Sequence, residues 1–137
     1  MFRFNRKSHA MVAALLLCVC GNVLSQQAPA PAPAGTWDGV IRSDTARVHV
    51  DANFNPKLAS LHFDEPFNCS VDASFLEADK DGSHYTFKPS VNGGQFCQGL
   101  YPGELLVSTP SATTLSLSLK NKKAAWTGTL TPTQAAH

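Results

Sequence analysis

Apolar and polar residues alternate strictly along three segments of this chain, and no long stretch repeats its apolar residues at the spacing of a helix. Such alternation places the apolar side chains on one face of a strand and the polar ones on the other. The apolar members are Val48, Val50 and Ala52, then Cys69, Val71, Ala73 and Phe75, and finally Leu115, Leu117 and Leu119. The pattern predicts an all-β, antiparallel protein with one dry face and one wet face.

Similar short sequences stand at the two ends of the alternating region. Trp37 is followed by Gly39 and Ile41 near the start, and the end has Trp126, Gly128 and Leu130 at the same spacing. We expect these two strands to be neighbours, since pairing them removes the open edges of a sheet. The prediction is a small antiparallel barrel of about eight short strands. An immunoglobulin sandwich is the alternative, but it would have a Trp between its two cysteines, and none occurs there.

The first 25 residues have the pattern of a secretory signal peptide. Arg3, Arg6 and Lys7 precede an apolar run over residues 10–19, and small residues around Ser25 offer a cleavage site. The run is too short for a membrane span. We therefore expect residues 1–25 to be removed and the mature protein to be periplasmic or secreted. Residues 26–34, rich in Ala and Pro, predict an extended linker, residues 35–132 the barrel domain, and residues 133–137 a flexible tail.

Two cysteines, Cys69 and Cys97, remain after removal of the signal. In an oxidising compartment a lone pair without metal-ligand spacing predicts a disulfide. On the chain-entropy model, closing a loop of this length stabilises the fold by about 3 to 4 kcal/mol.

The balance of charge excludes some classes of partner. The chain has 11 basic and 10 acidic residues, and loss of the three basic residues of the signal leaves 8 against 10. A nucleic-acid-binding domain needs a basic face, so we expect no nucleic-acid partner. The same balance gives no basic patch for a membrane surface, and no membrane-spanning segment is expected in the mature chain.

The loop between the first two alternating strands sets their register. A reversal around Asn55 and Pro56 with an even-numbered loop puts apolar residues opposite apolar residues. The predicted partners are Val48 with Phe63, Val50 with Leu61, Ala52 with Ala59, His49 with His62, and Asp51 with Ser60.

A second reversal is expected at Asp81-Gly82, a strong signal for a two-residue hairpin. It would pair Leu76 with Phe87 and Ala78 with Tyr85. Because Phe75 and Leu76 are adjacent and both apolar, the inward face must switch there, which predicts a β-bulge.

Gly35-Thr36-Trp37 opens the first predicted strand directly after the Ala/Pro-rich segment. This start resembles the Gly-x-Trp start of lipocalin-like and avidin-like (calycin) barrels. The resemblance covers three residues. It implies a barrel fold and, as one possible function, a carrier that holds a small apolar ligand inside the barrel.

Histidines and carboxylates gather on the predicted wet face. His49 and His62, with Asp51 and Asp64 near them, have the ligand types that zinc or copper accepts. Their spacing matches no dedicated ligand motif, so we predict a polar sheet face with neither metal nor cofactor.

The longest irregular segment runs from residue 90 to residue 103 and combines glycines, a cysteine and apolar residues. Loops of this kind on a rigid sheet are frequent recognition sites. Phe96 and Leu100 can instead plug the barrel end, with Tyr101 as the exposed member. A second candidate is a lysine-rich turn, which could dock on an acidic partner. The candidate partner-binding residues are Gln95, Phe96, Leu100, Tyr101, Lys120, Lys122 and Lys123.

No catalytic motif is present: the sequence has no Gly-x-Ser-x-Gly, no His-Glu-x-x-His and no phosphate-binding loop. We predict no enzyme activity. Small exported β domains with one disulfide resemble the lysozyme inhibitors and immunity proteins of bacteria in layout. The leading hypothesis is therefore an exported binding protein that inhibits or neutralises another envelope protein, and the alternative is the calycin-like carrier.

Overall fold

The computed structural model describes residues 32–90 and 93–133, which form eight strands and one short helix. The strands are β1 (Gly35–Arg42), β2 (Arg47–Phe54), β3 (Leu58–Phe63), β4 (Cys69–Asp79), β5 (Gly82–Phe87), β6 (Glu104–Ser111), β7 (Thr114–Lys120) and β8 (Ala125–Pro132). The helix α1 (Gln95–Leu100) lies between β5 and β6.

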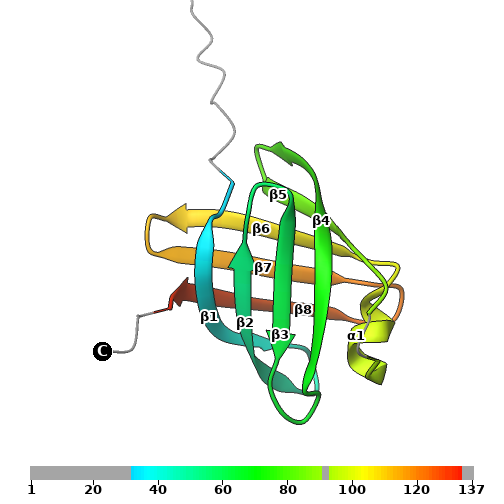
Figure 1. Ribbon diagram of the computed structural model, residues 1–137. Helices are drawn as coiled ribbons and strands as arrows, with labels where there is room; N and C mark the ends of the chain where they lie inside the picture. Colours follow the sequence, from blue (N-terminus) through cyan, green and yellow to red (C-terminus); the bar gives the residue numbers. More distant parts are fainter. Residues whose placement is uncertain (1–31, 91–92, 134–137) are drawn as a thin grey trace, which may run out of the picture.

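The strands form a closed antiparallel barrel in sequence order, in which β1 pairs with both β2 and β8. Figure 1 shows β1 to β4 crossing in front of β6 to β8, with α1 at one end of the barrel. The all-β barrel prediction is confirmed, including the pairing of the first strand with the last. Because successive strands run up and down, their connections alternate between the two ends of the barrel.

Glycines at the β1–β8 seam allow the barrel to close. A Cβ atom on Gly39 would clash with the backbone oxygen of Thr129, and one on Gly128 would clash with the backbone oxygen of Val40. These are the glycines of the two Trp-x-Gly sequences. Their function at the seam is to let two backbones approach closely.

Large apolar side chains fill the barrel interior. Phe63, Tyr85 and Leu115 are at most 1% exposed, and the partly buried Trp37 packs against the same core. An eight-stranded barrel has an interior just wide enough for such side chains. Four hollows on the described part of the chain lie on the outer wall or at the barrel ends.

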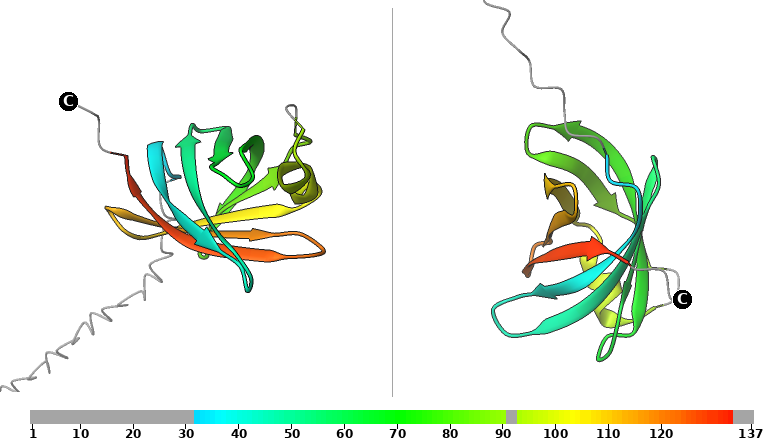
Figure 2. Two further views of the ribbon diagram at one scale, coloured as in Figure 1. Left: turned by 90° about the horizontal axis from the view of Figure 1, so that it is seen from below. Right: turned by 90° about the vertical axis from the view of Figure 1, so that its left-hand side faces the viewer.

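Aromatic side chains plug the end of the barrel where α1 lies. Phe96 of α1 stacks on Phe67 with ring centres 4.0 Å apart, and it meets the edges of Phe63 and Trp126. The predicted disulfide is present, and it joins Cys69 at the start of β4 to Cys97 in α1 with a Cα–Cα distance of 6.1 Å. Figure 2 shows α1 seated at this end of the barrel.

The register between β2 and β3 differs from the prediction by two residues. The central residues of the turn are Pro56 and Lys57, because the Asn55 side chain accepts hydrogen bonds from the backbone of Lys57 and Leu58. A shift of two residues keeps every side chain on its predicted face. It changes the partners: Val50 pairs with Phe63, Asp51 with His62, Ala52 with Leu61, Asn53 with Ser60 and Phe54 with Ala59.

The β-bulge in β4 is confirmed, whereas the predicted cross-strand partners of Leu76 and Ala78 are wrong. The register shifts between Phe75 and Glu77, and the intervening Leu76 is 60% exposed. Tyr85 pairs with Phe75, and Phe87 pairs with Ala73. The turn is Lys80-Asp81, one residue earlier than predicted. The next residue, Gly82, is instead the first of β5, where its missing Cβ makes room for the Val107 backbone of β6.

The predicted signal peptide and most of the predicted linker lie outside the described residues, as do residues 134–137 of the predicted tail. Within the described linker residues, Pro33 is buried, and the Ala34 carbonyl accepts a hydrogen bond from the Trp37 indole at 2.9 Å. Among the residues that the structure describes, no helix has the length and apolar character needed to cross a membrane.

Candidate functional site

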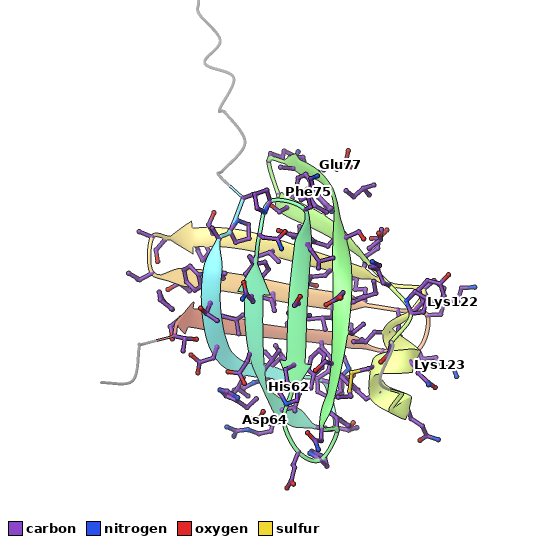
Figure 3. The ribbon with its side chains drawn as sticks, in the orientation of Figure 1. His62, Asp64, Phe75, Glu77, Lys122 and Lys123 are labelled. Carbon is purple, nitrogen blue, oxygen red and sulfur yellow. A yellow bond between two sulfur atoms is a disulfide. The ribbon has the colours of Figure 1, made fainter. Side chains whose placement is uncertain are left out.

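The structure brings the two predicted partner-binding segments together at one end of the barrel. We call this region the α1 end surface, and it consists of the exposed side chains of Gln95, Gln98, Tyr101, Lys120, Lys122 and Lys123. In Figure 3, Lys122 and Lys123 lie beside α1. The sequence had predicted the loop and the lysine turn as two separate candidates.

The residues of the irregular segment divide between the core and the solvent. Leu100 is 1% exposed and Phe96 is partly buried in the aromatic plug, so both serve the fold. Tyr101 directly follows Leu100 and is 49% exposed. Helix α1 therefore fastens the segment with its inner face and leaves Gln95 and Tyr101 available to a partner.

Asn121 connects the lysine turn to the helix. Its Oδ1 accepts hydrogen bonds from the backbone of Lys123 and Ala124, each at 2.7 Å, and its Nδ2 donates to the Gly99 carbonyl oxygen at 2.7 Å. The same side chain thus shapes the turn and attaches it to α1. Sequence reasoning missed this residue, although an Asn at the start of a short turn is a known signal.

An exposed aromatic residue within a polar and basic surface is suited to protein recognition. Tyrosine supplies a large contact area and a hydroxyl at a low entropic cost, and it is enriched among residues that dominate binding energy. Lys122 and Lys123 give the surface a positive charge that attracts an acidic partner, whereas Lys120 lies opposite Glu104 of β6. The disulfide and the Asn121 hydrogen bonds hold these groups in place before any partner arrives.

A second polar region lies on the outer wall of β1, β2 and β3. We call it the His–Asp cluster, and its members are Asp38, His49, Asp51, His62 and Asp64. The corrected register creates it, since Asp51 pairs with Asp38 on one side and with His62 on the other. Figure 3 shows His62 and Asp64 together at the end of β3.

His49 is hydrogen-bonded at both ring nitrogens. Nε2 lies 3.0 Å from Asp38 Oδ2 and Nδ1 lies 2.9 Å from Asp64 Oδ2. An ionised carboxylate only accepts hydrogen bonds, so when Asp38 and Asp64 are both ionised the two nitrogens donate and the ring is an imidazolium. A ring in this state has no free lone pair and cannot act as a general base.

The hydrogen bonds and charges of the cluster shift the pKa values of its members. The hydrogen bond to Asp38 raises the pKa of His49, burial opposes this rise, and the carboxylates of Asp51 and Asp64 add to it. The pKa of the Asp38 carboxyl is lowered by His49 and by the Thr133 hydroxyl, which donates to Asp38 Oδ1 at 3.0 Å. The side chains of His49 and Asp38 are 37% and 35% exposed, so solvent screens their attraction.

The structure changes the relation between the two histidines named as metal candidates. His49 does not lie opposite His62 as predicted: the Asp64 backbone donates to the His49 carbonyl oxygen at 3.0 Å, and His62 pairs with Asp51. The cluster also contains Asp38, which sequence reasoning left out because the partners of β1 were not known.

The chain has no match among the models of protein families, among characterised proteins or among solved structures.

Proposed function

We propose that this protein is an exported, non-catalytic binding protein that uses the α1 end surface to bind an acidic region of another exported protein. An inhibitor or immunity-type role in the bacterial envelope fits this mode of action, because such a protein acts by covering a surface of its target. The disulfide is compatible with an oxidising compartment.

The observation that carries the proposal is the hydrogen bond between the Asn121 side chain and the Gly99 carbonyl oxygen. This bond holds the turn that carries the lysines against helix α1, and Tyr101 directly follows that helix. Tyr101 and the lysines therefore form one prearranged surface. Preorganised surfaces lose less conformational entropy on binding. The arrangement supports recognition of a folded protein partner.

The alternative function, a carrier of a small apolar ligand, receives no support from the interior. Leu100, Leu105 and Leu119 are at most 1% exposed, and Phe96 and Phe67 cover the end of the barrel near α1. A carrier needs a pocket of several hundred cubic ångströms for a ligand of ordinary size. The proposal therefore places binding on the outside of the barrel.

Lysines at the opposite end of the barrel provide a matched control for the role of charge. Lys57 and Lys80 are exposed in the β2–β3 and β4–β5 turns. Reversing both of them changes the net charge as much as reversing Lys122 and Lys123 does. A difference between the two double variants thus reports the location of the charge rather than its amount.

Affinity capture from an envelope extract tests the proposal. Residues 26–137 are immobilised as the parent, as Lys122→Glu/Lys123→Glu and as Lys57→Glu/Lys80→Glu, and bound proteins are identified by mass spectrometry. The proposal predicts an acidic protein that the parent and the Lys57/Lys80 variant retain and the Lys122/Lys123 variant loses. Equal capture by all three proteins, or release of a small apolar ligand from the purified parent without a protein partner, would contradict it.

A further inference from the structure

The proposed binding through the α1 end surface does not involve the His–Asp cluster. One ligand atom each from Asp38, His49 and Asp51 lies within 4.8 Å of those of the other two. The paired strand positions bring His62 next to Asp51. We propose that this cluster is a binding site for a divalent transition-metal ion of the zinc class, with Asp38, His49 and Asp51 as its ligands.

The spacing of the donor atoms suits such an ion. Two ligands bonded at about 2.0 to 2.1 Å to a tetrahedral zinc lie about 3.3 Å apart. His49 Nε2 and Asp38 Oδ2 are separated by 3.0 Å. An Asp51 carboxylate oxygen lies within 4.8 Å of the ligand atoms of both Asp38 and His49, and the Asp51 side chain is 49% exposed and free to turn toward the ion. Zinc would take the place of the proton between His49 Nε2 and Asp38, and that proton would pass to solvent.

The Asp64 carboxylate orients the His49 ring as metal-ligating histidines require. Such histidines use one ring nitrogen for the metal and bond the other to a carboxylate, a carbonyl or another polar group. His49 Nδ1 bonds to Asp64, which leaves Nε2 for the metal. His62 neighbours the site without being one of its ligands, because its Nδ1 lies 2.8 Å from the Ser70 hydroxyl and its Nε2 faces Asp64 Oδ1 at 3.8 Å.

The donor set selects the class of ion. Imidazole nitrogens favour zinc, copper and nickel, whereas calcium and magnesium prefer a shell of oxygen ligands alone. Asp51 and His62 also line a hollow of about 250 Å³ on the outer wall between β1 and β4. The ligand group is itself open to solvent, since the side chains of His49, Asp38 and Asp51 are 37%, 35% and 49% exposed.

Zinc titration of the mature protein without an affinity tag tests the proposal. Binding is measured at neutral pH by competition with a chromophoric chelator, and circular dichroism checks that each variant is folded. The parent is expected to bind one zinc ion per chain. His49→Gln should weaken binding by about a hundredfold or more, because it removes the imidazole ligand.

Two further variants separate a metal site from a merely structural cluster. Asp51→Asn leaves the short hydrogen bonds of His49 to Asp38 and Asp64 in place, so the fold is kept while a ligand is lost, and binding should fall by about tenfold or more. His84→Gln removes another histidine bonded to a carboxylate, since His84 lies 2.8 Å from Asp79, and it should bind zinc like the parent. Absence of binding at micromolar zinc, or equal binding by the parent, His49→Gln and Asp51→Asn, would overturn the proposal.

Discussion

The Asn121 side chain donates a hydrogen bond to the carbonyl oxygen of Gly99 at 2.7 Å, across 22 residues of sequence. Asn55 shapes its own turn in the same way, with Oδ1 accepting from the backbone two and three residues later, in the β2–β3 turn. The two asparagines thus make equivalent turns at opposite ends of the barrel. Only the connection from Asn121 to Gly99 adds a contact with α1.

This equivalence gives a direct prediction for stability. Asn55→Ala removes the bonds of one turn, whereas Asn121→Ala removes the same bonds and the bond to Gly99. A hydrogen bond contributes about 0.5 to 1.5 kcal/mol, so Asn121→Ala should lower the free energy of unfolding by about 1 kcal/mol more than Asn55→Ala does. Urea denaturation of both variants measures this difference. Equal losses would mean that the bond to Gly99 contributes nothing to stability.

Closure of the barrel predicts a large cost for adding a methyl group at the seam. Gly39→Ala and Gly128→Ala each place a Cβ against backbone atoms of the neighbouring strand, and we expect each to destabilise the fold by about 1 to 3 kcal/mol. Gly99→Ala is the control, because a Cβ there meets nothing within 4 Å and alanine favours the helix. Thermal unfolding compares the three variants. A seam variant as stable as the control would contradict the claim that the glycines of the β1–β8 seam are needed for close approach of the two backbones.

The disulfide predicts two observations on the mature protein. Its intact mass should show two thiols missing, and neither cysteine should react with an alkylating reagent before reduction. The double variant Cys69→Ser/Cys97→Ser should lose about 3 to 4 kcal/mol of unfolding free energy on the chain-entropy model. Two freely reactive thiols in the purified protein would show that the predicted bond is wrong.

The hydrogen bonds of His49 predict a dependence of stability on pH when a chelator keeps metal away. The pKa of His49 is raised, so its contribution is complete below its ordinary value of 6.5 and is lost as the pH rises through the folded value. The pKa of Asp38 is lowered, so its contribution is complete above its ordinary value of 3.8 and is lost as the pH falls through the folded value. Asp51, Asp64 and the neighbouring His62 are the other titratable groups around the ring.

The measurement is the melting-temperature difference between the parent and His49→Gln. It should be largest between the two ordinary values, near pH 5, and should shrink toward alkaline and strongly acidic pH. Both side chains are more than a third exposed, so the effect should stay below about 1 kcal/mol. A difference that grows above neutral pH would contradict the proposed charged state of His49.

The sequence pattern predicts the faces of the strands better than their partners. Alternation assigns the side chains of Val50 and Leu61 to the interior regardless of which residues lie opposite, because a register shift of two leaves parity unchanged. The partners depend on which residues occupy the turn. In the β2–β3 hairpin, the hydrogen bonds of the Asn55 side chain determine which residues form the turn. In the β4–β5 hairpin, the close approach of the Val107 backbone places Gly82 in the strand and not in the turn.

Prediction of the candidate sites is limited in the same way, because local signals identify single residues but not which residues lie together. Gln95, Tyr101 and the lysines could be chosen because glycines, an aromatic residue and a charge run are local signals. Their union into one surface depends on the contact between Asn121 and Gly99, which no local pattern contains. Asp38 joins the His–Asp cluster only through the pairing of β1 with β2, which is a property of the closed barrel.

The affinity of the captured partner for Tyr101→Ala tests the proposed function most directly. Leu76→Ala is the matched control, because Leu76 is the other large hydrophobic residue exposed on the described chain and lies in the β4 bulge. If Tyr101 anchors the interface, its truncation should weaken binding by about thirtyfold, or about 2 kcal/mol, and leave the melting temperature unchanged. Leu76→Ala should bind like the parent. Parent-like affinity of Tyr101→Ala, measured on folded protein, would contradict the assignment of binding to the α1 end surface.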